Sequence, residues 1–250
     1  MFDSHAHYED ERFDTDRSEL LDNLFRTGIT GIINCGSDEQ TSLHSLELSE
    51  RYENIYFTAG VHPENSPLCG NFEDWLEPML SHPKCVGIGE IGLDYHYDTP
   101  KECQRDVLVR QLEIADKLNK RVVIHNRESH RDLLDIVSLY PGVRGIFHSF
   151  SGSAEYAEIL VKKGWYISFS GVITFKNAEK PVRAAAVVPT DKILCETDCP
   201  YLTPHPHRGL RNHSGYLEFT IKKLAEIKGI AFEEMENITT DNAKTLFGIK

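Results

Sequence analysis

Histidines and carboxylates that could bind metal ions stand at six positions, each at the end of a short apolar segment. The first two form an H-x-H pair. Alternate residues of a strand point to the same side, so both imidazoles can bind one ion. Imidazole and carboxylate groups suit zinc, manganese and other divalent ions of the first transition row. The six candidate ligands are His5, His7, Glu90, His125, His148 and Asp198. This set predicts a metal centre.

The number of candidate ligands indicates more than one ion. A catalytic zinc usually has three protein ligands, and six exceed that requirement. Glu90 has two carboxylate oxygens and could bridge two ions about 3.5–4 Å apart, as in other two-metal hydrolases. A lone histidine or acid at a strand end more often caps a loop, but six at equivalent places are hard to explain that way. We therefore expect two divalent cations, with zinc, manganese, magnesium and cobalt all open as candidates.

Short apolar segments alternate with amphipathic helices along the 250 residues. Such alternation indicates a parallel sheet. Eight strand–helix units over about 250 residues favour a (β/α)8 TIM barrel over a doubly wound open sheet. We expect one α/β domain over residues 1–250. The predicted strands are Met1–His5, Ile29–Cys35, Ile55–Val61, Cys85–Glu90, Arg121–His125, Arg144–His148, Tyr166–Ser170 and Lys192–Thr197.

The clearest predicted helix is Lys101–Asn119, in which Leu108, Leu112, Ala115 and Leu118 fall on one face. In a barrel the carboxyl ends of all strands meet on one rim, where active sites are found. The candidate ligands should therefore converge there. The other predicted helices are Asp16–Thr27, Asp38–Tyr52, Ser129–Tyr140, Ser153–Lys163, Asn177–Val187, Ser214–Lys228 and Glu233–Phe247.

Further polar residues are predicted on the same rim. His62 follows the third strand and Arg127 follows His125. The loop after the last strand, YLTPHPHRGLRNHSG, gathers His207 and Arg208 in an otherwise acidic chain. Loops at this place in barrels often bind phosphate, and arginine suits that task. We expect His207 and Arg208 to contact substrate; a solvated loop stiffened by prolines is the alternative. His44, His82 and His130 are expected to be ordinary surface residues.

Composition limits the mode of binding. The chain has 27 Lys and Arg against 39 Asp and Glu, a formal net charge of −12. This excludes non-specific binding of nucleic acid through a broad basic face. It does not exclude a phosphate substrate held at metal ions, which bring their own positive charge.

The cysteines and the start of the chain indicate a cytoplasmic protein. The six cysteines are scattered without a C-x-x-C pair, as expected for reduced thiols. Cys199, beside Asp198, is expected to be a small buried residue and no nucleophile. The first residues show no signal peptide, and no apolar run reaches the length of a membrane span. We expect no membrane association, and a monomer is the default.

One motif points to a different function. GIGEIG, with Gly87, Gly89 and Gly92, matches the G-x-G-x-x-G fingerprint of dinucleotide-binding folds. That fingerprint requires a helix to begin at its last glycines, so that the helix N-terminus meets a pyrophosphate. Here LDYHYDTP follows, and Pro100 delays the helix. No nucleotide cofactor is therefore expected.

With these motifs in place, the chain resembles the TatD family of metal-dependent deoxyribonucleases, within the amidohydrolase-like barrels. The resemblance covers nearly all of the chain through DSHAH, GVHP, IGEIGLDY, VVIHNR, GIFHSFSGS, YISFSGVITFKNA, ETDCPYLTP, HRGLRN and NAKTLFG. Two departures concern only substrate fit: Cys199 stands where the family often has Ser, and Glu64 where it often has His.

The resemblance implies roles for individual residues. His5, His7, Glu90 and Asp198 would hold one metal, and Glu90, His125 and His148 the other. Substrate would contact His62, Arg127 and the loop around Arg208.

The implied activity is hydrolysis of DNA by water that two metal ions activate, with Asp198 also accepting the proton of that water. A 3′-5′ exonuclease fits the scarcity of basic surface. Two alternatives stay open from the sequence. The same centre could release a D-amino acid from tRNA, or the barrel could be a non-catalytic protein with structural metals.

Overall fold

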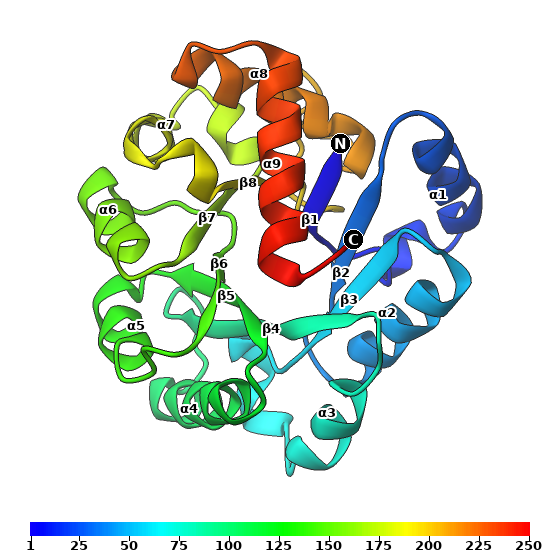
Figure 1. Ribbon diagram of the computed structural model, residues 1–250. Coiled ribbons are helices and arrows are strands. Elements are labelled where there is room, and N and C mark those ends of the chain that lie inside the picture. Colours follow the sequence, from blue (N-terminus) through cyan, green and yellow to red (C-terminus); the bar gives the residue numbers. More distant parts are fainter.

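Eight parallel strands form a nearly closed barrel surrounded by helices in the computed structural model, which describes residues 1–250 (Figure 1). Each strand pairs with the next one in the chain, so the order around the sheet is β1 to β8. The predicted (β/α)8 barrel is confirmed. The strands are β1 Phe2–Ala6, β2 Gly31–Cys35, β3 Ile55–Ala59, β4 Cys85–Asp94, β5 Arg121–Arg127, β6 Arg144–Phe147, β7 Tyr166–Phe169 and β8 Ile193–Cys195.

The predicted helices are all present, with ends that differ by a few residues. One further helix, α3, was not predicted because its apolar face is short and Pro78 lies within it. No helix is both long enough and apolar enough to cross a bilayer. The helices are α1 Arg17–Arg26, α2 Glu39–Arg51, α3 Glu73–Met79, α4 Lys101–Leu118, α5 His130–Val137, α6 Ala154–Lys162, α7 Glu179–Val187, α8 Leu217–Lys228 and α9 Phe232–Phe247.

Strand β4 is longer than expected and is irregular in its middle. The prediction that it ends at Glu90 was wrong, because Ile91–Asp94 continue the pairing with β5. The register shifts between Ile88 and Ile91, around Glu90. The glycines of GIGEIG belong to this strand: a Cβ at Gly92 would meet the backbone carbonyl of His125. Close strand packing therefore accounts for the glycine pattern.

The barrel closes where β1 meets the segment that follows β8, a region we call the seam. The backbone N–H of His7 donates to the Cys199 carbonyl at 2.8 Å, and that of Asp198 donates to the His5 carbonyl at 3.0 Å. The buried Asp3 carboxylate accepts hydrogen bonds from the Thr197 backbone N–H at 3.0 Å and from the Thr197 hydroxyl at 2.6 Å. These bonds place His5 and His7 beside Asp198.

The amino end of the barrel is covered by α9, which lies across it in Figure 1. The Asn242 side chain donates to the carbonyls of Thr190 and Ile193 at 2.7 and 2.8 Å, and so fixes α9 to the start of β8. An apolar cluster fills this end and leaves only the carboxyl end open. We call it the floor; it contains Phe2, Ile33, Cys35, Val123, Ile146, Leu194, Ala243, Leu246 and Phe247.

Candidate metal centre and substrate cavity

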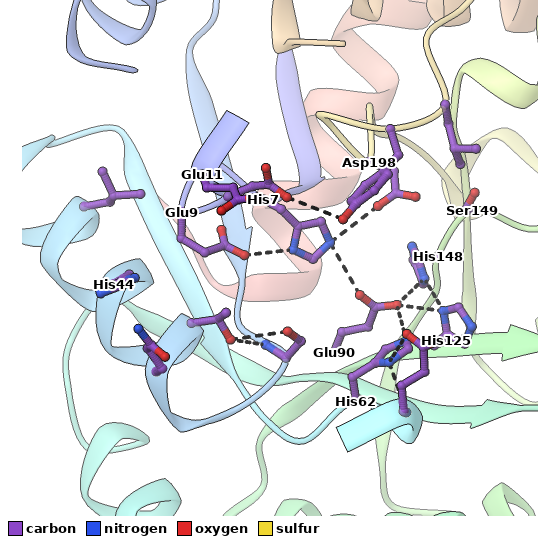
Figure 2. Close-up of a pocket in the computed structure, with 18 of the residues that line it drawn as sticks. His7, Glu9, Glu11, His44, His62, Glu90, His125, His148, Ser149 and Asp198 are labelled. Atoms are coloured by element: carbon purple, nitrogen blue, oxygen red, sulfur yellow. Dashed lines mark hydrogen bonds and ion pairs between the residues drawn. The ribbon is translucent and has the colours of Figure 1, made fainter. Parts of the chain in front are cut away.

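The six predicted ligands lie together at the carboxyl end of the barrel. Figure 2 labels five of them, His7, Glu90, His125, His148 and Asp198, and their side chains point toward one another. They come from five strands or from the residues directly after them, as the sequence predicted. Residues up to 193 positions apart in the chain therefore share one pocket. Their side chains divide into two groups around Glu90, whose two carboxylate oxygens face different partners.

The first group surrounds the Oε2 atom of Glu90. The Nε2 atoms of His5 and His7 lie 3.0 Å apart and 3.4 and 3.5 Å from this oxygen. The Oδ1 atom of Asp198 lies 3.5 and 3.4 Å from the same two nitrogens. His5, His7 and Glu90 form one group that could hold a metal ion, and His5 and Asp198 form another together with His148.

The second group surrounds the Oε1 atom of Glu90. The Nδ1 atom of His125 lies 2.7 Å and the Nε2 atom of His148 lies 2.8 Å from this oxygen. His62, predicted only as a substrate contact, also approaches it, with Nε2 at 3.5 Å. His62, Glu90 and His125 form one of the possible ligand groups, so His62 is a further candidate ligand.

The hydrogen bonds of the outer nitrogens test whether these histidines fit a metal. His7 Nδ1 donates to the Cys35 carbonyl at 2.9 Å. His125 Nε2 lies 2.9 Å from Asp94 Oδ2, and His148 Nδ1 lies 3.3 Å from Glu196 Oε1. With the proton on the outer nitrogen, the lone pair of the inner one faces the centre. Oxygen acceptors behind ligand histidines are typical of metal sites, so the residues fit divalent cations.

The electrostatics of the pocket favour positive charge. Burial raises the pKa values of Glu90 and Asp198, but the surrounding histidines outweigh burial and hold both pKa values below their usual range. Burial opposes protonation of His7, but the carboxylates of Glu9, Asp198 and Glu90 raise its pKa. By contrast, burial lowers the pKa of His62 to about 3. Ionised carboxylates in a buried pocket attract cations, as protons or as metal ions.

A cavity of about 1280 Å³ opens above these residues. Arg127 lines it without a carboxylate partner, and its guanidinium lies 5.3 Å from the centroid of the Tyr97 ring. Arg17 also lines it, but its guanidinium is occupied by the carbonyls of Tyr8 and Asp10 and by Asp14. Arg51, the last residue of α2, lines the cavity as well and has no carboxylate partner, so Arg127 and Arg51 are the two arginines of the cavity that can contact an anionic substrate.

Two of the predicted substrate contacts lie away from this cavity. The His207 ring stacks on Tyr216 at 4.4 Å between centroids. The Arg208 guanidinium lies 4.0 Å from the Phe175 ring centroid and donates to the Thr203 carbonyl. Neither residue lines the cavity, so the structure does not bring them to the metal ligands. Their contact with substrate stays a prediction.

Several residues of the site escaped the sequence analysis. Glu196 is completely buried, and its Oε1 atom lies 3.3 Å from His148 Nδ1. The sequence predicted it only as a residue of the last strand. His44, expected to be an ordinary surface residue, is exposed on α2 and lines the cavity.

Cys199 is completely buried, and burial raises the pKa of its thiol to about 12. A thiol that stays protonated agrees with the expectation that Cys199 is no nucleophile.

Comparison with known proteins identifies the family to which this chain belongs. The model of the TatD related DNase family matches residues 2–248. An uncharacterised metal-dependent hydrolase of Bacillus subtilis, YabD, is 41% identical, with 100% of this chain and 99% of that protein covered. The 3′-5′ ssDNA/RNA exonuclease TatD of Escherichia fergusonii is 31% identical, with 100% and 99% covered.

A solved structure agrees with the sequence relatives. The crystal structure of YjjV, a TatD homologue from Escherichia coli K12, superposes with a TM-score of 0.90 at 27% identity and covers 100% of this chain and 98% of its own. Fold, ligand set and relatives lead to the same result. The chain belongs to the TatD family, and it is a metal-dependent hydrolase.

Proposed function

We propose that this protein is a nuclease that removes nucleotides from the 3′ end of single-stranded DNA with the help of two divalent cations. The arrangement of the ligands around Glu90 supports this most directly, because each of its two oxygens faces a separate set of nitrogens. A shared carboxylate of this kind is typical of two-metal phosphodiesterases. A cavity of about 1280 Å³ exceeds the usual pocket for a small ligand and suits the end of a polymer.

Two cations at this place would supply a nucleophile at neutral pH and stabilise negative charge on the phosphoryl oxygens. His5, His7, Asp198 and Glu90 would hold one cation; Glu90, His125 and His148, with His62 nearby, would hold the other. Asp94 and Glu196 fix the ring orientation of His125 and His148.

Asp198 is suited to accept the proton of the attacking water. Its carboxylate lines the cavity, and the histidines His7, His5 and His148 hold its pKa below the usual range. It is therefore unprotonated at neutral pH, with its Oδ1 near His5 and His7. Arg127 would contact the scissile phosphate, because its guanidinium is not engaged by any carboxylate.

The function is tested with protein stripped by a chelator and reloaded separately with magnesium, manganese, cobalt or zinc. The substrates are single-stranded DNA labelled at the 5′ or at the 3′ end, and D-aminoacyl-tRNA in parallel. We expect metal-restored shortening of the 5′-labelled strand one nucleotide at a time, with early release of the 3′ label. Release of the amino acid alone would replace the nuclease with a deacylase. No turnover of either substrate, with metal stoichiometrically bound, would favour a non-catalytic barrel.

The first prediction concerns Asp198. We expect Asp198→Asn to keep the fold and to lower turnover of DNA by at least about 10²-fold, because the amide cannot accept the proton. Steady-state rates and circular dichroism measure the two effects. Asp135→Asn, an exposed carboxylate on α5, is the matched control and should keep full activity. Near-normal turnover of Asp198→Asn would remove this residue from the mechanism.

A further inference from the structure

Exposed aromatic rings are almost absent from this protein. The chain has 12 Phe, 10 Tyr and 2 Trp residues, and only Tyr97 and Tyr201 are exposed, at 49% and 48%. Both line the cavity above the metal ligands. The other Phe, Tyr and Trp side chains of the chain are more fully covered. Two half-exposed rings in one cavity therefore point to a ligand with apolar faces.

Tyr201 lies on the side of the first ligand group. It follows Asp198 by three residues, and its ring centroid lies 6.4 Å from that of His7. The Arg12 guanidinium lies 4.1 Å from the ring centroid, and the hydroxyl donates to Asp10 at 3.4 Å. These contacts fix the orientation of the ring while leaving about half of the residue in the cavity.

Tyr97 lies on the side of the second ligand group. It follows Asp94, the partner of His125, by three residues, and Arg127 lies over its ring. The neighbouring Tyr95 shows the contrast. Its hydroxyl donates to Asp132 at 2.8 Å, Lys101 Nζ lies 4.2 Å from its ring centroid, and Tyr95 is only partly exposed and does not line the cavity. Tyr97 has no hydrogen bond through its hydroxyl.

The charge of the cavity decides how these rings would be used. On the wall formed by the segment after β1 and by α2, carboxylates outnumber the two arginines, Arg17 and Arg51, so the wall disfavours phosphate groups. The carboxylates of this wall are Glu9, Asp10, Glu11, Asp14 and Glu47. A nucleic acid held here gains little from its backbone outside the metal centre. Its bases are uncharged and can stack on aromatic rings in any sequence.

We propose that Tyr97 and Tyr201 are stacking platforms for two nucleobases of a single strand, one on each side of the metal centre. This inference rests on the proposed function and adds how the strand is held. Each platform would favour an unpaired base, because a base within a duplex has no free face to offer. Selection of single strands would then come from stacking, and the phosphate contacts would be confined to the metal centre, Arg127 and Arg51.

The test compares Tyr201→Leu and Tyr97→Leu with Tyr201→Phe and Tyr97→Phe, which keep the rings. Binding by the metal-loaded protein is measured with single-stranded oligonucleotides that carry non-hydrolysable linkages and 2-aminopurine near the 3′ end. We expect quenching of 2-aminopurine fluorescence by the wild type and by the Phe variants. Each Leu variant should weaken binding by about 5- to 150-fold and reduce the quenching.

Two comparisons separate stacking from a general loss of binding. An oligonucleotide with abasic residues at the same positions should bind the Leu variants and the wild type equally. The dependence of binding on salt should not change in the Leu variants, because tyrosine releases no counterions. The proposal is overturned if abasic and base-containing strands lose affinity equally, or if the Leu variants bind normally.

This experiment can fail independently of the nuclease proposal. If metal-loaded wild type shortens no DNA, the proposed function fails, while the fluorescence measurement still decides whether bases stack on the two tyrosines. If DNA is shortened and the Leu variants keep the KM and kcat of the wild type, the nuclease stands and the stacking platforms are refuted.

Discussion

The two ends of the barrel are built from the same eight strands but hold opposite chemistry. At the floor, Phe247 of α9 packs with Phe2, Leu194 and other apolar side chains. At the other end, Glu90 and Asp198 are held among histidines in a cavity open to solvent. Apolar contacts at the floor stabilise the barrel, whereas the open end collects charges whose burial costs free energy.

This difference teaches where stability and activity reside. Substitutions at the floor should change the free energy of unfolding and leave the chemistry of the folded protein intact. Substitutions around the ligands should change metal binding and turnover with smaller effects on the fold. The division is expected for barrels with active sites at the carboxyl ends of their strands, and it can be tested residue by residue.

The largest expected effect is at the floor. Phe247→Ala should lower the free energy of unfolding by about 3 kcal/mol, because it leaves a cavity where a buried ring packed. Urea unfolding measures this change, and activity per folded molecule should stay at the wild-type level. Leu139→Ala is the control, since Leu139 is 73% exposed and its loss should change stability by at most about 0.5 kcal/mol. A large loss of activity per folded molecule would show that the floor contributes to activity as well as to stability.

A smaller effect is expected behind the ligands. Glu196→Gln removes the charge that supports His148 Nδ1 but leaves an oxygen for the Ser149 N–H. Metal affinity should fall by about 10- to 100-fold. Titration calorimetry with the stripped protein measures this fall, and Glu158→Gln, an exposed carboxylate on α6, should bind metal normally. Unchanged affinity would mean that Glu196 supports only the loop after β6.

The smallest expected effect is on the pH dependence of stability and concerns Cys85, the first residue of β4. Burial raises the pKa of this thiol to about 11, so the folded state keeps its proton after the unfolded chain has lost it. The contribution of the buried thiol to the free energy of unfolding is therefore full below pH about 9 and is lost as the pH rises toward 11. Unfolding between pH 8 and 10 should show wild type losing about 1 kcal/mol more than Cys85→Ala. Parallel pH profiles would show that Cys85 does not titrate this way.

Much of the site could be predicted because each candidate ligand lies in the carboxyl-terminal half of a strand or within three residues after it. In a parallel barrel, that position alone brings His5, His125 and Asp198 to one rim. The strands themselves are buried and nearly continuous in apolar residues, so they stand out from the helices. The end of β4 was missed because its apolar run is interrupted by Glu90 and Gly92, although a glycine at position 92 allows close packing against β5.

The remaining parts depend on three-dimensional detail that periodicity does not carry. Glu196 supports His148 across two strands, a relation set by strand register. His62 reaches Glu90 only because the segment after β3 turns inward. His207 and Arg208 show the reverse case. Their loop has the composition of a phosphate site, but Tyr216 and Phe175 engage their side chains outside the cavity.

The seam has a consequence for how the protein is made. His5 and His7 leave the ribosome well before Asp198, which follows His5 by 193 residues. A nascent chain therefore offers a cation only a partial set of ligands until the segment after β8 has emerged and bonded to β1. Because bringing such distant segments together is slow, loading of the centre belongs to the last stage of folding.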